Sequence, residues 1–266
     1  MKSPSVKLIY FSPTQTTKKI VEAIAQGAGI NRIEHLDLTP PEARTGAAME
    51  IEGQLTILGV PVYAGRVALE ATQRLRRLKV RQAPAVVVVL YGNRAYEDAL
   101  LELKDLAVEF GFIPVAAGAF IGEHSYDNKD TPIAPGRPDR EDLKKASDFG
   151  RLIRRKLEGI HGLHEMPPLT LPGEFPYKER GTTTRLPPQS QESLCTKCGT
   201  CVNVCPTAAI TMGDTVATNV TSCISCCACV KNCPTKARIV VDPGIKERAA
   251  RLNKMCGQRR EPETYL

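Results

Sequence analysis

Short apolar runs alternate with amphipathic stretches along roughly the first 160 residues of the chain. Runs rich in β-branched and other apolar residues, typical of strands, lie at residues 6–11, 55–63, 85–90 and 112–120, and we expect a further strand at residues 32–38. Apolar side chains recur at helical spacing from Thr16 onward and within residues 68–79, 95–111 and 140–158. Strands that alternate with helices are typical of a parallel sheet covered by helices on both faces.

The run AVVVVL at residues 85–90 is apolar at every position, so we expect both of its faces to be buried. Such a run is typical of a central strand in a parallel sheet. Five strand-and-helix units suit one three-layer, doubly wound α/β domain, which we assign to residues 1–162.

The composition changes beyond residue 162. Residues 163–190 hold six prolines and show little periodicity, so we expect residues 163–186 to form an extended linker on the surface. Residues 187–245 hold nine of the ten cysteines and are assigned to a second, small domain. Residues 246–266 form a charged tail, and part of residues 243–265 is expected to be helical.

The length of 266 residues and the 42% hydrophobic content allow one full domain and a smaller second one. No stretch approaches the roughly 18 to 20 apolar residues that span a bilayer. The N-terminus MKSPSVKLIYFS runs directly into a strand pattern and does not resemble a signal peptide. We therefore expect a soluble, cytoplasmic protein with no membrane partner.

Two segments of the second domain share one cysteine spacing. CTKCGTCVNVCP at residues 195–206 and CISCCACVKNCP at residues 223–234 both follow the pattern C-x2-C-x2-C-x3-C-P. In a reducing compartment, cysteines spaced so closely favour metal binding over disulfides. Structural zinc is the alternative, but zinc sites usually use two ligand pairs separated by a longer loop. Cys227 and Cys256 lie outside the pattern, and we expect both to be spectator thiols.

This spacing, with both prolines, resembles that of bacterial two-cluster ferredoxins. The resemblance implies that the first three cysteines of each segment hold one 4Fe-4S cluster and that the fourth holds the other cluster. On that basis the first cluster is bound by Cys195, Cys198, Cys201 and Cys233, and the second by Cys223, Cys226, Cys229 and Cys205.

The segment YFSPTQTTKKI, which follows the first strand, resembles the phosphate loop of flavodoxins. In that loop, hydroxyl and backbone N–H groups at a helix N-terminus hold the phosphate of FMN. The residues that would bind it here are Ser12, Thr14, Gln15, Thr16 and Thr17. Gln15 stands where a small residue is usual, which predicts a loop of different shape. Serine and threonine before a helix are also ordinary N-caps.

Two further segments follow the third and fourth strands and belong at the same sheet edge. They supply Pro61, Val62, Tyr63, Ala64, Gly65 and Arg66, then Tyr91, Gly92, Asn93, Arg94 and Tyr96. Tyr63, with Tyr91 or Tyr96, is expected to pack against the isoalloxazine ring. Arg66 and Arg94 are expected to stabilise the anionic reduced flavin near N1, with solvated loop arginines as the alternative.

Nearly all of the chain is similar to the flavodoxin-ferredoxin fusion family of anaerobic bacteria and archaea. The similarity includes the segments VPVYAGRV, YGNRAYEDAL and EHSYDNKDTPIAPGRPD. It implies a flavodoxin-like, five-stranded parallel sheet in the order 2-1-3-4-5 and a small C-terminal α+β ferredoxin domain. The cofactors it implies are FMN and two 4Fe-4S clusters.

A flavin exchanges one electron or two, whereas each cluster exchanges only one. We therefore expect an iron-sulfur flavoprotein that converts one-electron into two-electron steps and serves a redox partner protein, either a ferredoxin or a reductase. The alternative is an FMN-dependent reductase of a small organic substrate, with the clusters as electron inlet. His124 and Tyr126 are weak candidates for its proton donor. The sequence leaves open whether the protein is an enzyme or a carrier.

A third hypothesis, a zinc-binding nucleic-acid module, is suggested by the net charge of +7 and the isoelectric point near 8.9. Two clusters of about −2 each and a flavin phosphate of about −2 would bring that charge close to neutral. We therefore expect no nucleic-acid partner.

Overall fold

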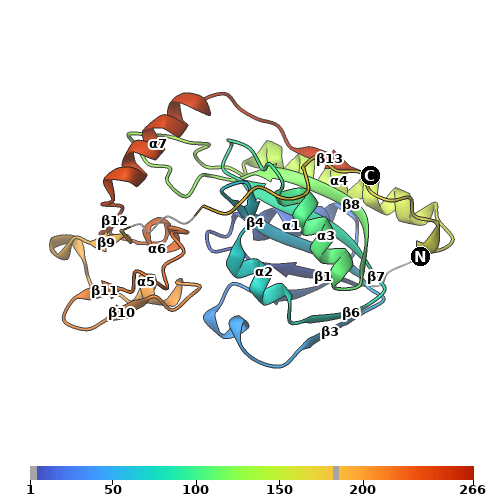
Figure 1. Cartoon of the computed structure of the whole chain (residues 1–266), viewed down its shortest axis with the longest axis horizontal. Coiled ribbons are helices and arrows are strands. Elements are labelled where there is room, and N and C mark those ends of the chain that lie inside the picture. The colour runs from blue at the N-terminus through green and yellow to red at the C-terminus, as the bar shows by residue number, and fades with distance from the viewer. Residues whose placement is uncertain (1–4, 182–185) are drawn as a thin grey trace.

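The computed structural model describes residues 5–181 and 186–266 (Figure 1). Residues 1–4 of the predicted first domain and residues 182–185 of the predicted linker lie outside this description. Figure 1 shows the central sheet and its helices beside the smaller cysteine-rich domain, with α7 above the cysteine-rich domain and the chain continuing from it to β13 on the sheet. Within the described ranges, no helix has both the length and the apolar character needed to cross a bilayer.

The central sheet confirms the predicted fold. Its five parallel strands, in spatial order, are β2 (Arg32–Asp37), β1 (Ser5–Tyr10), β4 (Leu55–Tyr63), β7 (Ala83–Tyr91) and β8 (Phe112–Ile121). In chain order this is the 2-1-3-4-5 arrangement of the flavodoxin-like fold. All nine residues of β7 are buried, because helices cover both faces of the sheet.

Two helices cover each face of the sheet. On one face lie α1 (Thr16–Gly27) and α4 (Arg140–Glu158), which pack on Val86, Val88 and Leu90 of β7. On the other lie α2 (Leu69–Leu75) and α3 (Ala99–Glu109), which pack on the alternate residues of β7. Gly27 allows α4 to approach α1, because a Cβ there would lie 1.9 Å from the carbonyl oxygen of Ser147.

The structure adds strands that the sequence did not predict. The expected helix over residues 68–79 ends at Leu75, and β6 (Leu78–Arg81) follows it and pairs in parallel with β3 (Met49–Glu52). The two-residue strand β5 (Arg66–Val67) folds back on the end of β4. Strand β13 (Glu263–Tyr265) pairs antiparallel with β8 and extends the sheet beyond the predicted five strands.

The cysteine-rich domain is built from short elements. Its helices are α5 (Thr200–Asn203) and α6 (Ala228–Lys231), each lying within one cysteine segment. Two antiparallel ribbons complete it: β9 (Gln189–Ser190) with β12 (Arg238–Ile239), and β10 (Ile210–Met212) with β11 (Val216–Thr218). A 3-10 turn at Glu192–Leu194 precedes its first cysteine. Further 3-10 turns lie outside this domain, at Pro41–Arg44 and Leu163–Glu165.

The predicted linker lies along the first domain as a strap. The Asp98 carboxylate accepts the backbone N–H groups of Glu174 and Lys178 at 3.0 and 2.8 Å. Burial raises the pKa of Asp98, but these N–H donors outweigh it, so the pKa lies below its usual range. Arg180 donates to the Glu102 carboxylate at 2.8 Å. The strap is therefore fixed to α3 and to the turn that precedes it.

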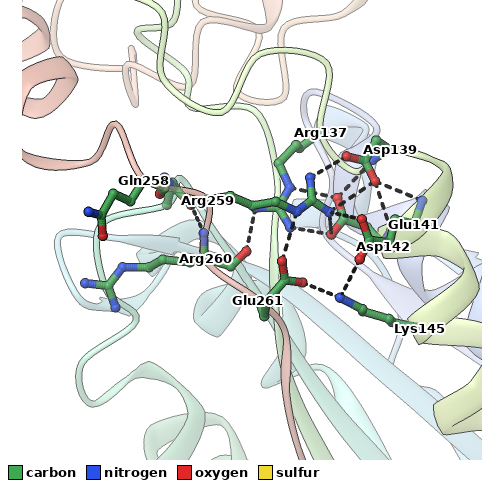
Figure 2. A network of polar contacts seen from close by, with 10 residues as sticks. Arg137, Asp139, Glu141, Asp142, Lys145, Gln258, Arg259, Arg260 and Glu261 are labelled. Carbon is green, nitrogen blue, oxygen red and sulfur yellow. Dashed lines mark hydrogen bonds and ion pairs between the residues drawn. The ribbon is translucent and has the colours of Figure 1, made fainter.

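The predicted tail is also fixed to the first domain. Helix α7 (Pro243–Met255) leads to a segment whose Arg259 reaches the acidic residues at the start of α4 (Figure 2). Its guanidinium lies 2.6 Å from Asp139 and 3.4 Å from Asp142. The buried Arg137 joins Asp142 to the carbonyl oxygen of Arg260, to which it donates at 2.8 Å. These contacts hold α7 over the first domain.

The fully buried Arg74 of α2 links the two domains. Its guanidinium pairs with Glu70 at 3.0 Å and donates to the carbonyl oxygens of Thr39 and Pro40 at 2.7 and 2.9 Å. It also donates to the carbonyl oxygen of Pro206, the residue after Cys205. An arginine is charged at all accessible pH values, so each of these acceptors compensates its burial.

Replacing Arg74 with methionine is expected to lower the free energy of unfolding by about 3 to 5 kcal/mol, because Glu70 would lose its buried partner. Denaturant unfolding followed by far-UV circular dichroism measures the change. Arg154→Gln, on the exposed face of α4, is the control and is expected to stay within about 0.5 kcal/mol of the wild type. Equal stability of the Arg74 and Arg154 variants would show that Arg74 does not hold the domains together.

Candidate functional site

A cavity of about 610 Å³ lies at the carboxyl ends of β1, β4, β7 and β8. Cavities of this size hold small-molecule ligands and cofactors. Its lining from the first domain is Pro13, Thr14, Thr16, Thr17, Pro61, Val62, Tyr63, Ala64, Gly65, Leu90, Tyr91, Gly92, Arg94, Ala95, Gly122, Glu123, His124, Ser125 and Tyr126. Thirteen of these residues were predicted as site residues from the sequence, and the structure brings them around one cavity.

The loop after β1 supplies hydroxyl and N–H groups to the cavity. Thr14 and Thr16 line it, with their hydroxyls 3.3 Å apart, as does Thr17. The backbone N–H groups of Thr16 and Thr17, in the first turn of α1, have no acceptor among the described residues. Free N–H groups at a helix N-terminus are donors for a phosphate.

Ser12 and Gln15 lie outside the cavity, although the sequence predicted both as phosphate binders. The Ser12 hydroxyl accepts the backbone N–H of Lys18 at 3.1 Å and so caps α1. Gln15 adopts a left-handed conformation with φ of 63°, and its side chain donates to the Ser12 carbonyl at 3.2 Å. The loop thus has a different shape from one with a small residue at this position, as the sequence suggested.

Tyr63 and Tyr91 are the predicted ring-packing residues that line the cavity. Burial and the nearby Cys226 and Cys227 raise the pKa of Tyr63 well above its usual value, so its phenol stays neutral. Tyr96 lies behind Tyr91, with ring centroids 5.4 Å apart. Its hydroxyl is bonded to Glu263 and Tyr265 of the C-terminal strand, at 2.7 and 3.0 Å, and does not reach the cavity.

Arg66 and Asn93 also lie outside the cavity, contrary to the prediction. Arg66 is drawn toward α3, where its guanidinium forms a two-pronged pair with Glu102 at 2.8 and 2.9 Å. Asn93 holds the C-terminal segment, because its side-chain amide donates to the carbonyl oxygens of Cys256 and Gln258. Arg94 lines the cavity but is paired with Glu97 at 2.5 Å.

His124 and Tyr126 lie on the wall formed by the loop after β8, with ring centroids 5.1 Å apart. Nδ1 of His124 accepts the backbone N–H of Tyr126 at 3.0 Å, which leaves the proton of the neutral ring on Nε2. Burial, with the positive charges of Lys231 and Arg94, lowers the pKa of His124 to about 4. Gly92 makes room for this ring, because a Cβ there would lie 2.3 Å from Cδ2.

The remaining wall comes from segments outside the first domain. It consists of Lys178 of the strap, Ile224 and Ser225 of the cysteine-rich domain, and Arg248, Arg251, Leu252 and Met255 of α7. No local pattern in the sequence indicates these residues, because they are near the cavity only through long-range packing. The apolar spacing of Leu252 and Met255 within a helical tail was the one available hint.

Two smaller cavities divide the patterned cysteines into two sets of four. One is lined by Cys195, Cys198, Cys201 and Cys233, and the other by Cys205, Cys223, Cys226 and Cys229. In the described part of the chain, no three Cys, His, Asp or Glu side chains lie close enough together to hold a single metal ion. Four sulfurs around a cavity suit a polynuclear cluster. This division is the crossed arrangement that the resemblance to two-cluster ferredoxins implies.

The two cysteine segments repeat one backbone conformation. Lys197 and Ser225, one residue before the second cysteine of each segment, have φ values of 52° and 55°. Gly199 and Cys227, one residue after it, have φ values of 77° and 59°. Left-handed conformations at non-glycine residues are costly and are kept where a site requires them. The sequence repeat is therefore also a structural repeat, and each copy curves its cysteines around a cavity.

Arg238 lies between the two cysteine cavities and is almost fully buried. It lines the first cavity, and its guanidinium lies 3.8 Å from Cys229 Sγ of the second. It also donates to the carbonyl oxygen of Pro188 at 2.6 Å and to the Thr218 hydroxyl at 2.9 Å. Its Nε has no acceptor among the described residues. A fixed positive charge is thus available to both cysteine sets, where thiolates or anionic clusters would require it.

Two cysteines outside the pattern differ in position. Cys227 is buried and lines the second cysteine cavity, and burial raises its pKa to about 12. Cys256 ends α7 and packs with Ile133 and Leu252, away from both cysteine cavities. Cys256 therefore serves as an internal control thiol for the eight patterned cysteines.

Residues 188–211 match the 4Fe-4S binding domain family. Among solved structures, an archaeal flavodoxin aligns at 13% identity, covering 58% of this chain and 99% of that chain, with a TM-score of 0.40. A flavodoxin from Streptococcus pneumoniae aligns at 14% identity over 57% and 99%, with a TM-score of 0.38. Rubredoxin oxygen:oxidoreductase from Desulfovibrio gigas aligns at 13% identity over 58% and 36%, with a TM-score of 0.39.

No curated protein matches the chain. The chain spans only 36% of the length of the Desulfovibrio oxidoreductase. The strand order of the parallel sheet identifies the flavodoxin-like fold. The chain thus joins a flavodoxin-like domain to a 4Fe-4S binding domain.

Paired cysteine substitutions test the division into two sets. If each set holds one 4Fe-4S cluster, Cys201→Ala with Cys233→Ala, which removes two cysteines of one set, is expected to lower the iron content from about eight to about four atoms per chain. Cys201→Ala with Cys205→Ala, close in sequence, removes one ligand from each set and is expected to lose nearly all iron. Iron and sulfide analysis of anaerobically reconstituted protein measures both, with Cys256→Ala as control. The same iron content in the two double variants would contradict the crossed arrangement.

His124 is expected to remain neutral down to about pH 5, because burial lowers its pKa to about 4. An ordinary histidine is half protonated near pH 6.5. The imidazole 15N resonances of histidine-labelled protein, assigned with His124→Gln, report its protonation. Arg94→Gln removes one nearby positive charge and is expected to raise the pKa. Titration of wild-type His124 near pH 6.5 would mean that the ring is solvated.

Proposed function

We propose that the protein binds FMN in the large cavity and a 4Fe-4S cluster in each cysteine cavity, and transfers electrons between them. The observation that carries this proposal is a shared wall. Ile224, which follows Cys223, lines both the large cavity and the second cysteine cavity. It packs against the apolar core of the first domain, and Tyr63 stands near Cys226 and Cys227. A flavin and a cluster in these positions are close neighbours.

The donor sets fit the proposed groups. The free N–H groups of Thr16 and Thr17, with neighbouring hydroxyls, suit the FMN phosphate. Tyr63 and Tyr91 offer aromatic surface for the ring. Cysteine sulfurs are the ligands that 4Fe-4S clusters take. When bound, the clusters exchange single electrons and the flavin exchanges one or two, so the protein converts between one-electron and two-electron steps.

The two cysteine sets differ in exposure, which gives the proposed path a direction. In the first set Cys198 is exposed and Cys195 is half-buried. In the second set only Cys223 is not fully buried. The first cluster is therefore the one that an external redox protein, such as a ferredoxin, would contact. The second cluster is the one beside the flavin.

Lys231 of α6 helps to hold the second cysteine set against the cavity. Its ammonium lies 2.6 Å from the Glu123 carboxylate and donates to the carbonyl oxygen of Asp127 at 2.9 Å. Glu123 itself lines the large cavity. Together with Arg74 and its bond to Pro206, this pair fixes the second set from two sides.

A second candidate function is reduction of a small organic substrate at the flavin, with the clusters as electron inlet. The observation that favours it is the composition of the cavity, which continues past the flavodoxin loops to α7. His124, with its proton on Nε2, lines the same cavity. A neutral imidazole of this kind can donate a hydrogen bond to a substrate atom.

Rapid mixing with chemically reduced ferredoxin, a donor too large to enter the cavity, tests the proposal. In the wild-type holoprotein, the visible flavin band is expected to bleach. Cys198→Ala, which removes an outer-cluster ligand, is expected to abolish this bleaching, whereas Cys256→Ala retains it. Dithionite should still reduce FMN in both variants, which shows that the flavin is intact. Equal rates with ferredoxin in the two variants would refute a path through the outer cluster.

A further inference from the structure

Helix α7 presents a mixed charged and apolar stripe to the large cavity. Arg248, Arg251, Leu252 and Met255 all line it. Their spacing of three, four and seven residues along a helix puts them on one side. Lys246 and Lys254 of the same helix do not line the cavity, whereas Arg248, which is half-buried, and Arg251, which is exposed, both do. The two arginines therefore differ from the lysines of α7 in lining the cavity.

The other charged groups around the cavity are paired. Arg94 and Lys178 both pair with Glu97, at 2.5 and 2.7 Å. Glu123 pairs with Lys231 at 2.6 Å. Within residues 5–181 and 186–266, by contrast, neither the Arg248 nor the Arg251 side chain has an ion pair or a hydrogen bond. Two positive charges thus face the cavity without a protein partner, and like charges three residues apart on a helix repel each other.

We infer that Arg248 and Arg251 form an anion site for the carboxylate of a small organic ligand bound beside the flavin. This inference rests on the proposed function, because it takes FMN to occupy the rest of the cavity. Guanidinium groups bind carboxylates with paired, charge-assisted hydrogen bonds. Leu252, Met255 and Ile224 lie in the same cavity and suit an apolar body on that ligand. The ligand class is therefore an organic carboxylate with an apolar or aromatic body.

FMN itself has two anionic groups that Arg248 and Arg251 could bind instead of a ligand carboxylate: its phosphate and its reduced ring. Its phosphate has separate donors in the loop of Thr16 and Thr17, on another element of the chain. The reduced ring is anionic near N1, but the oxidised ring carries no such charge. Measurements on the oxidised holoprotein therefore exclude the reduced ring as the anion that the arginines hold.

The test titrates oxidised holoprotein with benzoate and with the neutral analogue benzamide. Perturbation of the flavin absorption bands and isothermal calorimetry report binding. Benzoate is expected to bind at least about tenfold more tightly than benzamide, because a charge-assisted pair contributes at least 1.4 kcal/mol. Arg248→Gln with Arg251→Gln is expected to weaken benzoate binding by about tenfold or more. The control, Lys246→Gln with Lys254→Gln, removes the same charge from α7 residues that do not line the cavity and should change benzoate binding less than about twofold.

Each other outcome is informative. Equal weakening by the two double variants, or equal binding of benzoate and benzamide, would overturn the site, and so would the absence of benzoate binding to FMN-loaded protein. Loss of FMN from the Arg248 and Arg251 variant, measured by calorimetric titration of FMN, would also overturn it and assign the pair to the cofactor. Failure of the wild-type protein to bind FMN would refute the proposed function instead.

Discussion

The burial of one arginine between two domains is the constraint on which the rest of the structure depends. Arg74 is fully buried and gathers carbonyl oxygens from the loop after β2 and from Pro206 of the cysteine-rich domain. A charge in such a place is costly unless every donor finds an acceptor, so the two backbone segments must approach together. The Arg74 guanidinium also forms a cation–π contact with the ring of Phe11, 5.1 Å from its centroid. Phe11 follows β1, where the loop that resembles a flavodoxin phosphate loop begins. One side chain thus connects the start of the large cavity with the residue that follows Cys205.

The requirement that buried charges have partners also explains why the strap and the tail form walls of the cavity. Glu102 of α3 is nearly buried and takes guanidinium groups from both Arg66 and Arg180. Asp98 takes two backbone N–H groups of the strap, which brings Lys178 to the cavity. At the C-terminus, Arg259 and Arg137 tie the chain to Asp139 and Asp142 (Figure 2). Segments that read as polar linker and charged tail are therefore ordered by charges that find partners on the first domain.

The local sequence pattern was sufficient to predict an element where the residues of that element alone determine its structure. The run AVVVVL predicted β7, because a strand that is buried on both faces is apolar at nearly every position. The end of α2 at Leu75 could not be predicted, since Leu78–Arg81 becomes a strand only by pairing with Met49–Glu52. Arg66 shows the same limit in the site. Its place after β4 suggested the flavin, but Glu102, 36 residues later, holds its guanidinium. Arg248 and Arg251 were missed because nothing in their own segment indicates the cavity that α7 covers.

The cysteine repeat gains its proposed direction from its surroundings. Both segments share the cysteine spacing and the left-handed residues beside the second cysteine. Taken alone, such a repeat makes two equivalent sites, and electrons would have no preferred end at which to enter. The first domain removes the equivalence, because Arg74 and Lys231 press only one cysteine set against the large cavity and leave Cys198 at the surface. Burial and hydrogen bonding tune cluster potentials, so unequal burial would give two clusters held by identical cysteine sets unequal roles. Under the proposed function, fusion of the two domains would thus convert a symmetric pair of sites into an ordered path between the surface and the large cavity.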